Sequence, residues 1–91
     1  MSKSLTKIIN SMTYNEKIAW FATARSVTVG EITQVFEDTL VTSYTARVHG
    51  FIISDGKNYM HKTKEEARAY GKRILAAWKA EYAQLTANNA E

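Results

Sequence analysis

The sequence of 91 residues contains no cysteine and no proline. Without cysteine, the chain has no disulfide, no thiolate ligand for zinc or an iron–sulfur cluster, and no cysteine nucleophile. This composition fits a reducing compartment, and we expect a cytoplasmic protein. The lack of proline suits uninterrupted strands and helices. A chain of this length can bury one hydrophobic core, so we expect one domain over residues 1–86 and a frayed tail over residues 87–91.

Long apolar runs and catalytic motifs are missing as well. The N-terminus lacks the apolar stretch of a signal peptide, and no segment approaches the roughly 18 consecutive apolar residues of a membrane helix. The sequence has no G-x-S-x-G, no G-x-x-x-x-G-K-[ST], no G-x-G-x-x-G and no H-E-x-x-H. We therefore expect a binding protein that is not an enzyme, with no cofactor, no metal and no membrane partner.

Hydrophobic spacing and capping signals predict an α+β fold. Thr13-x-x-Glu16 is a capping box within a segment of helical periodicity, which predicts one or two helices over the first 25 residues. Thr63-x-x-Glu66 is a second capping box, and it opens a long C-terminal helix. Residues 26–53 are rich in Val, Ile, Thr, Phe and Tyr, which favour strands. The prediction is a three-stranded antiparallel meander with the long helix packed on one face.

Two turn signals set the expected register of the sheet. Glu37-Asp38 joins the first two strands, and Asp55-Gly56 joins the second and third, so that Phe51 lies opposite Met60 and His49 opposite Lys62. One face of this sheet is the predicted core face, with Val27, Val29, Val35, Leu40, Tyr44, Ala46, Val48, Ile52 and Tyr59.

A winged helix-turn-helix is the alternative fold. Thr28-x-x-Glu31 also has the spacing of a capping box, and the apolar residues that follow fit a helical stripe as well as a strand. The segment 41–62 would then be the wing. Arg25 and Ser26 depart from this motif, because it prefers an apolar residue and glycine at those positions. Thr, Val, Ile and Gly are poor helix formers, so the meander is the favoured prediction.

The charge pattern supports a hypothesis of nucleic-acid binding. The net charge of +3 averages two basic ends and an acidic middle segment. Lys64, Arg68 and Lys72 recur every four residues and form one stripe on the predicted helix. Basic and aromatic residues on the outer sheet face add hydrogen-bond donors and a stacking surface. The residues predicted to contact nucleic acid in such a regulatory protein are Arg47, His49, Lys57, Lys62, Lys64, Arg68, Lys72 and Arg73.

The apolar residues of the outer sheet face support a second hypothesis. An apolar patch on a monomer usually marks association with another protein. The chain would then be an inhibitor or adaptor of the kind that phages and mobile elements encode, such as a host-takeover or anti-defence protein. A homodimer through the same face is compatible with either hypothesis. The residues of this predicted interface are Ile32, Phe36, Val41, Phe51 and Met60.

Overall fold

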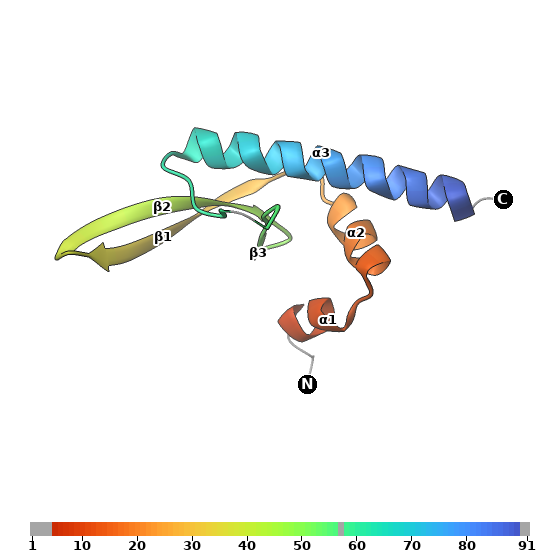
Figure 1. Cartoon of the computed structure of the whole chain (residues 1–91), viewed down its shortest axis with the longest axis horizontal. Coiled ribbons are helices and arrows are strands. Elements are labelled where there is room, and N and C mark those ends of the chain that lie inside the picture. Colours follow the sequence, from red (N-terminus) through yellow and green to blue (C-terminus); the bar gives the residue numbers. More distant parts are fainter. Residues whose placement is uncertain (1–4, 57, 90–91) are drawn as a thin grey trace.

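Two short helices precede a three-stranded antiparallel sheet, and one long helix follows it (Figure 1). The computed structural model describes residues 5–56 and 58–89. The strands are ordered β1-β2-β3, so the α+β meander with a long C-terminal helix is confirmed. The elements are α1 (Leu5–Ser11), α2 (Tyr14–Ala22), β1 (Thr28–Phe36), β2 (Thr39–Val48), β3 (Phe51–Ile52) and α3 (Lys64–Asn89).

The winged-helix alternative is wrong, because the segment after Thr28 is a strand. β1 pairs with β2 along its whole length, from Thr28 opposite Arg47 to Phe36 opposite Thr39. The β-branched residues and Gly30 of this segment disfavour a helix, and the antiparallel ladder satisfies the backbone groups that a helix would have paired internally. The capping-box spacing of Thr28 and Glu31 is therefore coincidental.

The first predicted turn is confirmed and the second is wrong. Glu37 and Asp38 have φ angles of 50° and 62°, as a tight two-residue hairpin requires, and Val35 lies opposite Leu40. The second reversal, however, occurs at His49 and Gly50, whose φ angles are 54° and 81°. Val48 therefore pairs with Phe51, and Asp55-Gly56 lies in the loop that follows β3.

Aromatic packing explains the position of the second turn. With the reversal at His49-Gly50, Phe51 lies on the same face as Val48 and its ring centroid is 5.9 Å from that of Trp20. A turn at Asp55-Gly56 would have placed Phe51 on the solvent side. Beyond β3, the chain returns to the sheet at His61, which forms an isolated bridge with Tyr44. Phe51 is thus not opposite Met60, nor His49 opposite Lys62.

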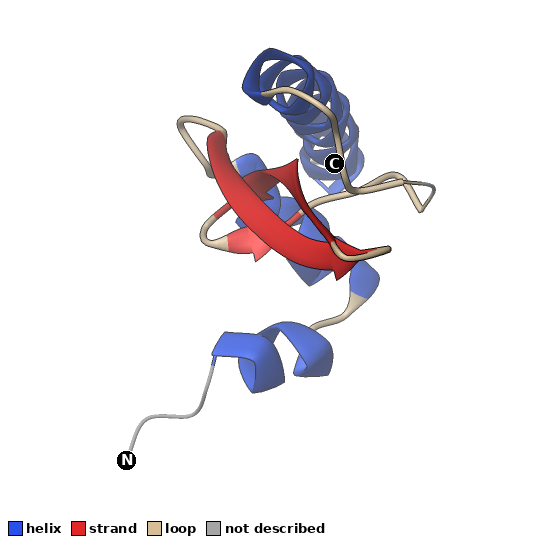
Figure 2. Ribbon diagram, turned by 90° about the vertical axis from the view of Figure 1, so that its left-hand side faces the viewer, coloured by secondary structure: helices blue, strands red, loops and turns tan. Residues whose placement is uncertain are grey.

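α3 covers one face of the sheet, and Figure 2 shows this arrangement with the helix seen from its end. The core lies where α3 crosses this face, and its buried residues are Ala24, Ala46, Val48, Ile53, Ile74 and Leu75. Gly71 permits this close packing, because a Cβ atom there would overlap Val27 and lie 2.8 Å from the Cβ atom of Ala46. The predicted core face is confirmed only in this region.

Four residues of the predicted core face are exposed. Val35 and Leu40 are exposed at the far end of the hairpin, and Tyr59 is exposed in the loop after β3. Ile52 pairs with Arg47 and therefore lies on the opposite face of the sheet. The alternation of residues identified the face of β1 and β2 correctly, but α3 covers only part of that face.

α2 packs against the C-terminal half of α3. The ring of Phe21 lies 5.0 Å from that of Trp78, and the Tyr14 hydroxyl donates a hydrogen bond of 2.6 Å to the Glu81 carboxylate. This hydrogen bond raises the pKa of Tyr14. α3 continues to Asn89, past the domain boundary predicted at residue 86, and residues 90–91 lie outside the described part.

The capping box at the start of α2 forms as predicted. The Thr13 Oγ1 atom accepts a hydrogen bond from the Glu16 backbone N–H at 3.2 Å, and the Glu16 carboxylate accepts one from the Thr13 N–H at 2.9 Å. The backbone hydrogen bond from Thr13 lowers the pKa of Glu16. The stabilisation is therefore present at neutral pH and is lost as the pH falls through the folded-state pKa of Glu16.

We predict that Thr13→Ala lowers the free energy of unfolding by about 1 kcal/mol, because an N-cap hydroxyl is lost. The substitution should also move the pKa of Glu16 part of the way toward its ordinary value, because the hydrogen bond with the Thr13 hydroxyl is lost while that with the backbone N–H remains. Urea unfolding measures the first effect and an NMR titration of Glu16 measures the second. Thr13→Ser keeps the hydroxyl and should leave both unchanged, whereas equal behaviour of the two variants would contradict the role of the cap.

Candidate interaction surfaces

The β1–β2 hairpin extends beyond the start of α3 as an arm (Figure 1). All residues from 33 to 42, which we call the hairpin arm, are exposed. Four of them are large and apolar, with exposed fractions of 70% for Val35, 68% for Phe36, 72% for Leu40 and 45% for Val41. Val35 and Leu40 share the face that α3 covers elsewhere, whereas Phe36 and Val41 lie on the other face. The arm therefore presents apolar side chains on both faces.

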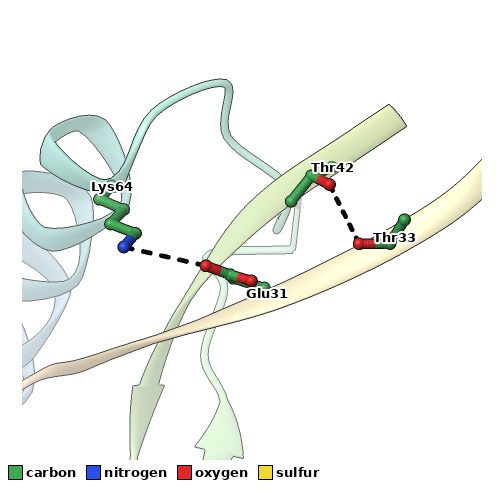
Figure 3. Close-up of polar contacts among 4 residues, drawn as sticks. All are labelled: Glu31, Thr33, Thr42 and Lys64. Atoms are coloured by element: carbon green, nitrogen blue, oxygen red, sulfur yellow. Dashed lines mark hydrogen bonds and ion pairs between the residues drawn. The ribbon is translucent and has the colours of Figure 1, made fainter. Parts of the chain in front are cut away.

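The sequence of the arm holds it in an extended hairpin. The tight turn fixes the two strands, and the hydroxyls of Thr33 and Thr42 are joined by a hydrogen bond of 3.0 Å (Figure 3). At the base of the arm, the ammonium group of Lys64 lies 3.8 Å from the carboxylate of Glu31, which links β1 to the first residue of α3 (Figure 3). Such an exposed ion pair adds little stability, so the backbone pairing of β1 with β2 is the main interaction that keeps the arm extended.

The tip of the arm is acidic. Glu37 and Asp38 form the turn itself, and both residues are exposed. In the chain, Glu37 directly follows Phe36, and Asp38 lies two residues before Leu40. A partner that covers the arm would therefore meet an apolar surface with two negative charges at its end.

The structure brings together only part of the predicted protein interface. Phe36 and Val41 lie on the outer face of the arm, with the half-buried Ile32 closer to its base. Phe51 is half-buried against Trp20 and Phe21 on the inner face, so its assignment to the outer face is wrong.

Met60 is half-buried in the loop after β3 and does not join the arm. Val35 and Leu40 complete the apolar surface of the arm instead, although their alternation predicted them in the core. A sequence signal for the arm existed, since both strands beside the Glu37-Asp38 turn carry apolar residues on both faces.

The outer sheet face does not have the predicted basic and aromatic composition. His49 packs its ring on Trp20, with a centroid distance of 4.2 Å, and its Nε2 atom lies 3.0 Å from the Trp20 carbonyl oxygen. Arg47 folds across Gly30, and its Nε atom donates to the Thr45 hydroxyl at 3.1 Å. His49 thus stabilises the join between α2 and the sheet. Lys62 is exposed in the loop before α3, and Lys57 lies outside the described residues.

The basic residues of α3 lie on different sides of the helix. The Lys64 ammonium is 5.9 Å from the ring centroid of Tyr44, beside its ion pair with Glu31, whereas the Arg73 guanidinium lies over Tyr70 at 5.2 Å.

Arg68 and Lys72 line the same hollow on α3. Lys72 also lines an open groove of about 270 Å³ between α3 and the segment that precedes β1. Arg25 and Lys79 border this groove, and neither was predicted as a site residue. We call it the basic groove, and its apolar lining is formed by Val27, Leu75 and Ala76.

The two histidines do not form a common site. His61 packs against Tyr70 with ring centroids 4.6 Å apart, and its Nε2 atom is buried without a hydrogen-bond partner. Among residues 5–56 and 58–89, no three His, Asp or Glu side chains come together as metal ligands. No helix in the same ranges combines the length and apolar character that crossing a membrane requires.

Comparisons of the chain with protein-family models, with curated proteins and with solved structures gave no match. The candidate binding surfaces of the molecule are the hairpin arm and the basic groove.

Proposed function

We propose that the protein is a non-enzymatic protein-binding module that acts through the hairpin arm. The observation that carries this proposal is the exposure of Val35, Phe36, Leu40 and Val41 on a projecting hairpin. Large apolar side chains that gather on a monomer usually mark an association surface. The partner should offer an apolar cleft with basic side chains at its end, because the tip carries Glu37 and Asp38.

Apolar burial and backbone hydrogen bonds of the arm can together offset the cost of association. Complete burial of each large apolar side chain contributes about 1.5–3 kcal/mol. Four such side chains provide a gain comparable with the cost of about 4–15 kcal/mol for protein association. The backbone groups along the outer edge of β1 can add hydrogen bonds to an extended partner segment, as in β-strand addition. The arm thus supplies both an apolar and a hydrogen-bonding contribution.

Nucleic-acid binding is the competing proposal. The contacts of the predicted basic residues support it less than the exposed arm supports protein binding. Arg47 and His49 engage groups of the same chain, and Lys64 pairs with Glu31. The acidic tip of the arm would also repel phosphates. Arg68 and Lys72, with Arg25 and Lys79, remain as an exposed basic surface. Nucleic-acid binding by this surface is therefore a distinct outcome of the test below.

We predict that Phe36→Asp weakens partner binding about 30-fold or more, because it places a charge in the apolar contact. The tagged chain is first recovered from the cells that express it, and the stoichiometric partner is identified and produced separately. Titration calorimetry with the two purified proteins then measures the affinity. Ala80→Asp, which adds the same charge at an exposed position of α3, is the matched control and should bind like the unsubstituted protein.

Salt and nucleic acid distinguish the two proposals. Binding through the arm should persist at high salt, because its main contribution is apolar. Equal affinities for Phe36→Asp and Ala80→Asp would contradict the arm as the binding element. Tight, salt-sensitive binding of duplex or single-stranded DNA or RNA that is lost in Lys72→Glu and kept in Phe36→Asp would instead establish a nucleic-acid-binding protein.

A further inference from the structure

We infer that a second copy of this chain binds the hairpin arm, by antiparallel pairing of β1 with its own equivalent. This inference rests on the proposed function, since it names the partner of the same arm. Two observations point to a second copy: β1 is an open edge strand, and the acidic tip has its complement in the basic groove of the same chain. The pairing would join two three-stranded sheets into one continuous sheet.

β1 is suited to such pairing. Among the described strands it has a neighbour on one side only, and it is nine residues long. Natural edge strands are commonly protected by Pro, Lys, a bulge or a short length. The sequence of β1 contains no Pro and no Lys, and the register with β2 is continuous from Thr28 to Phe36. Glu31 is its only charged residue, and this carboxylate pairs with Lys64 of α3.

A two-fold axis at Ile32 gives the most favourable register. Thr28 then lies opposite Phe36 of the second copy, and the whole strand is paired. Val29 meets Val35 of the second copy, and Ile32 meets its equivalent. Glu31 lies opposite a threonine, whereas an axis at Glu31 would place two carboxylates directly opposite each other, which is destabilising.

The same register brings the acidic tip of each copy to the basic groove of the other. Continuing the ladder past Thr28 places Glu37 and Asp38 of the second copy opposite Val27 and Ser26. Both of these residues line the basic groove, next to Arg25, Lys72 and Lys79. The two-fold symmetry repeats the contact, so the interface is closed and carries two tip-to-groove pairs.

The inferred pairing also covers Val35 on the inner face of the arm. Directly opposite residues in an antiparallel ladder share a face, so Val35 of the second copy lies on the α3 side of the joined sheet. There it approaches the apolar lining of the groove, which includes Leu75 and Ala76. One interface thus pairs the open edge, neutralises the tip and shields Val35.

Charge reversal on the two sides provides the test. The tip variant is Glu37→Lys/Asp38→Lys, and the groove variant is Arg25→Glu/Lys72→Glu/Lys79→Glu. Sedimentation equilibrium should show a dimer for the unsubstituted protein at about 200 μM and about 100-fold weaker dimerisation for each variant alone, because like charges then face each other. An equimolar mixture should regain the dimer, because both tip-to-groove pairs become complementary again.

A second tip variant separates charge from turn geometry. Glu37→Asn/Asp38→Gly places at the turn the residues that this turn type favours and removes both charges. It should keep the hairpin and dimerise about tenfold more weakly, and its dimer should depend less on salt.

Three results would overturn the second copy as partner. These are a monomeric unsubstituted protein at the highest concentration, unchanged dimers in both charge variants, or a mixture that remains monomeric. If the protein is monomeric but Phe36→Asp still loses a purified heterologous partner, the proposed function stands and only the identity of the partner is wrong.

Discussion

Phe51→Asp is expected to lower the free energy of unfolding by about 3 kcal/mol or more. The Phe51 ring lies 5.9 Å from Trp20 and 6.4 Å from Phe21, at the point where α2 meets the sheet. Loss of a fully buried phenylalanine costs about 3–5 kcal/mol; Phe51 is half-buried and loses less by this route, and desolvation of the new carboxylate adds to the cost. A domain of this size has a total stability of about 5–15 kcal/mol, so the loss is a large part of it.

Urea unfolding, followed by the fluorescence of Trp20 and Trp78, measures this effect. The matched control is Phe36→Asp, which makes the same chemical change at an exposed position. Its free energy of unfolding should change by about 0.5 kcal/mol or less. Unchanged stability of Phe51→Asp, or a large loss of stability in Phe36→Asp, would contradict the packing of Phe51 against α2 and the exposure of Phe36 on the arm.

Gly71→Ala is expected to destabilise the protein by about 1–3 kcal/mol, because overpacking forces α3 away from the sheet. The added Cβ atom would overlap Val27 and lie 2.8 Å from the Cβ atom of Ala46. Alanine favours a helix over glycine by about 1 kcal/mol, so helix propensity alone predicts the opposite sign. Thermal or urea unfolding shows which effect is larger.

The double variant Gly71→Ala/Val27→Ala is the control for this prediction. Val27→Ala removes the methyl groups that the new Cβ atom would overlap. The double variant should therefore lose less free energy of unfolding than the sum of the losses in the two single variants, as expected for residues in contact. Additive effects, or a stabilised Gly71→Ala protein, would contradict the close approach of α3 to the sheet.

Local signals in the sequence predicted the helices, the first two strands and one of the two turns, whereas the third strand was expected after Asp55-Gly56 and lies at Phe51–Ile52. Thr13 and Glu16 form the predicted cap, and the Glu37-Asp38 turn fixed the register of β1 and β2 correctly. The second turn could not be assigned in this way, because His49-Gly50 and Asp55-Gly56 both accommodate a reversal. The choice depends on the packing of Phe51 against α2, which local turn preferences do not contain.

The candidate sites were less predictable than the fold. The alternation of residues along the two strands placed Val35 and Leu40 on the correct face of the sheet. It does not reveal at which point along the strands the covering helix begins. Because α3 starts beside Glu31, the strands beyond that point extend as an exposed arm. The basic groove combines Arg25 with Lys72 and Lys79 from a distant segment, so the four-residue spacing along the helix identified only one of its three cations.

Photocrosslinking from position 36 tests the function of the hairpin arm most directly. Phe36 is replaced by benzoylphenylalanine, which keeps an aromatic side chain, and Ala80 is replaced likewise as a control. We predict that position 36 alone crosslinks to protein, at a segment with apolar residues next to Lys or Arg. For a second copy, this segment would be the start of β1 around Thr28, which lies opposite Phe36 in the inferred register and follows Arg25 and Val27 in the chain. Crosslinks to nucleic acid only, or equal protein crosslinking from positions 36 and 80, would contradict binding through the arm.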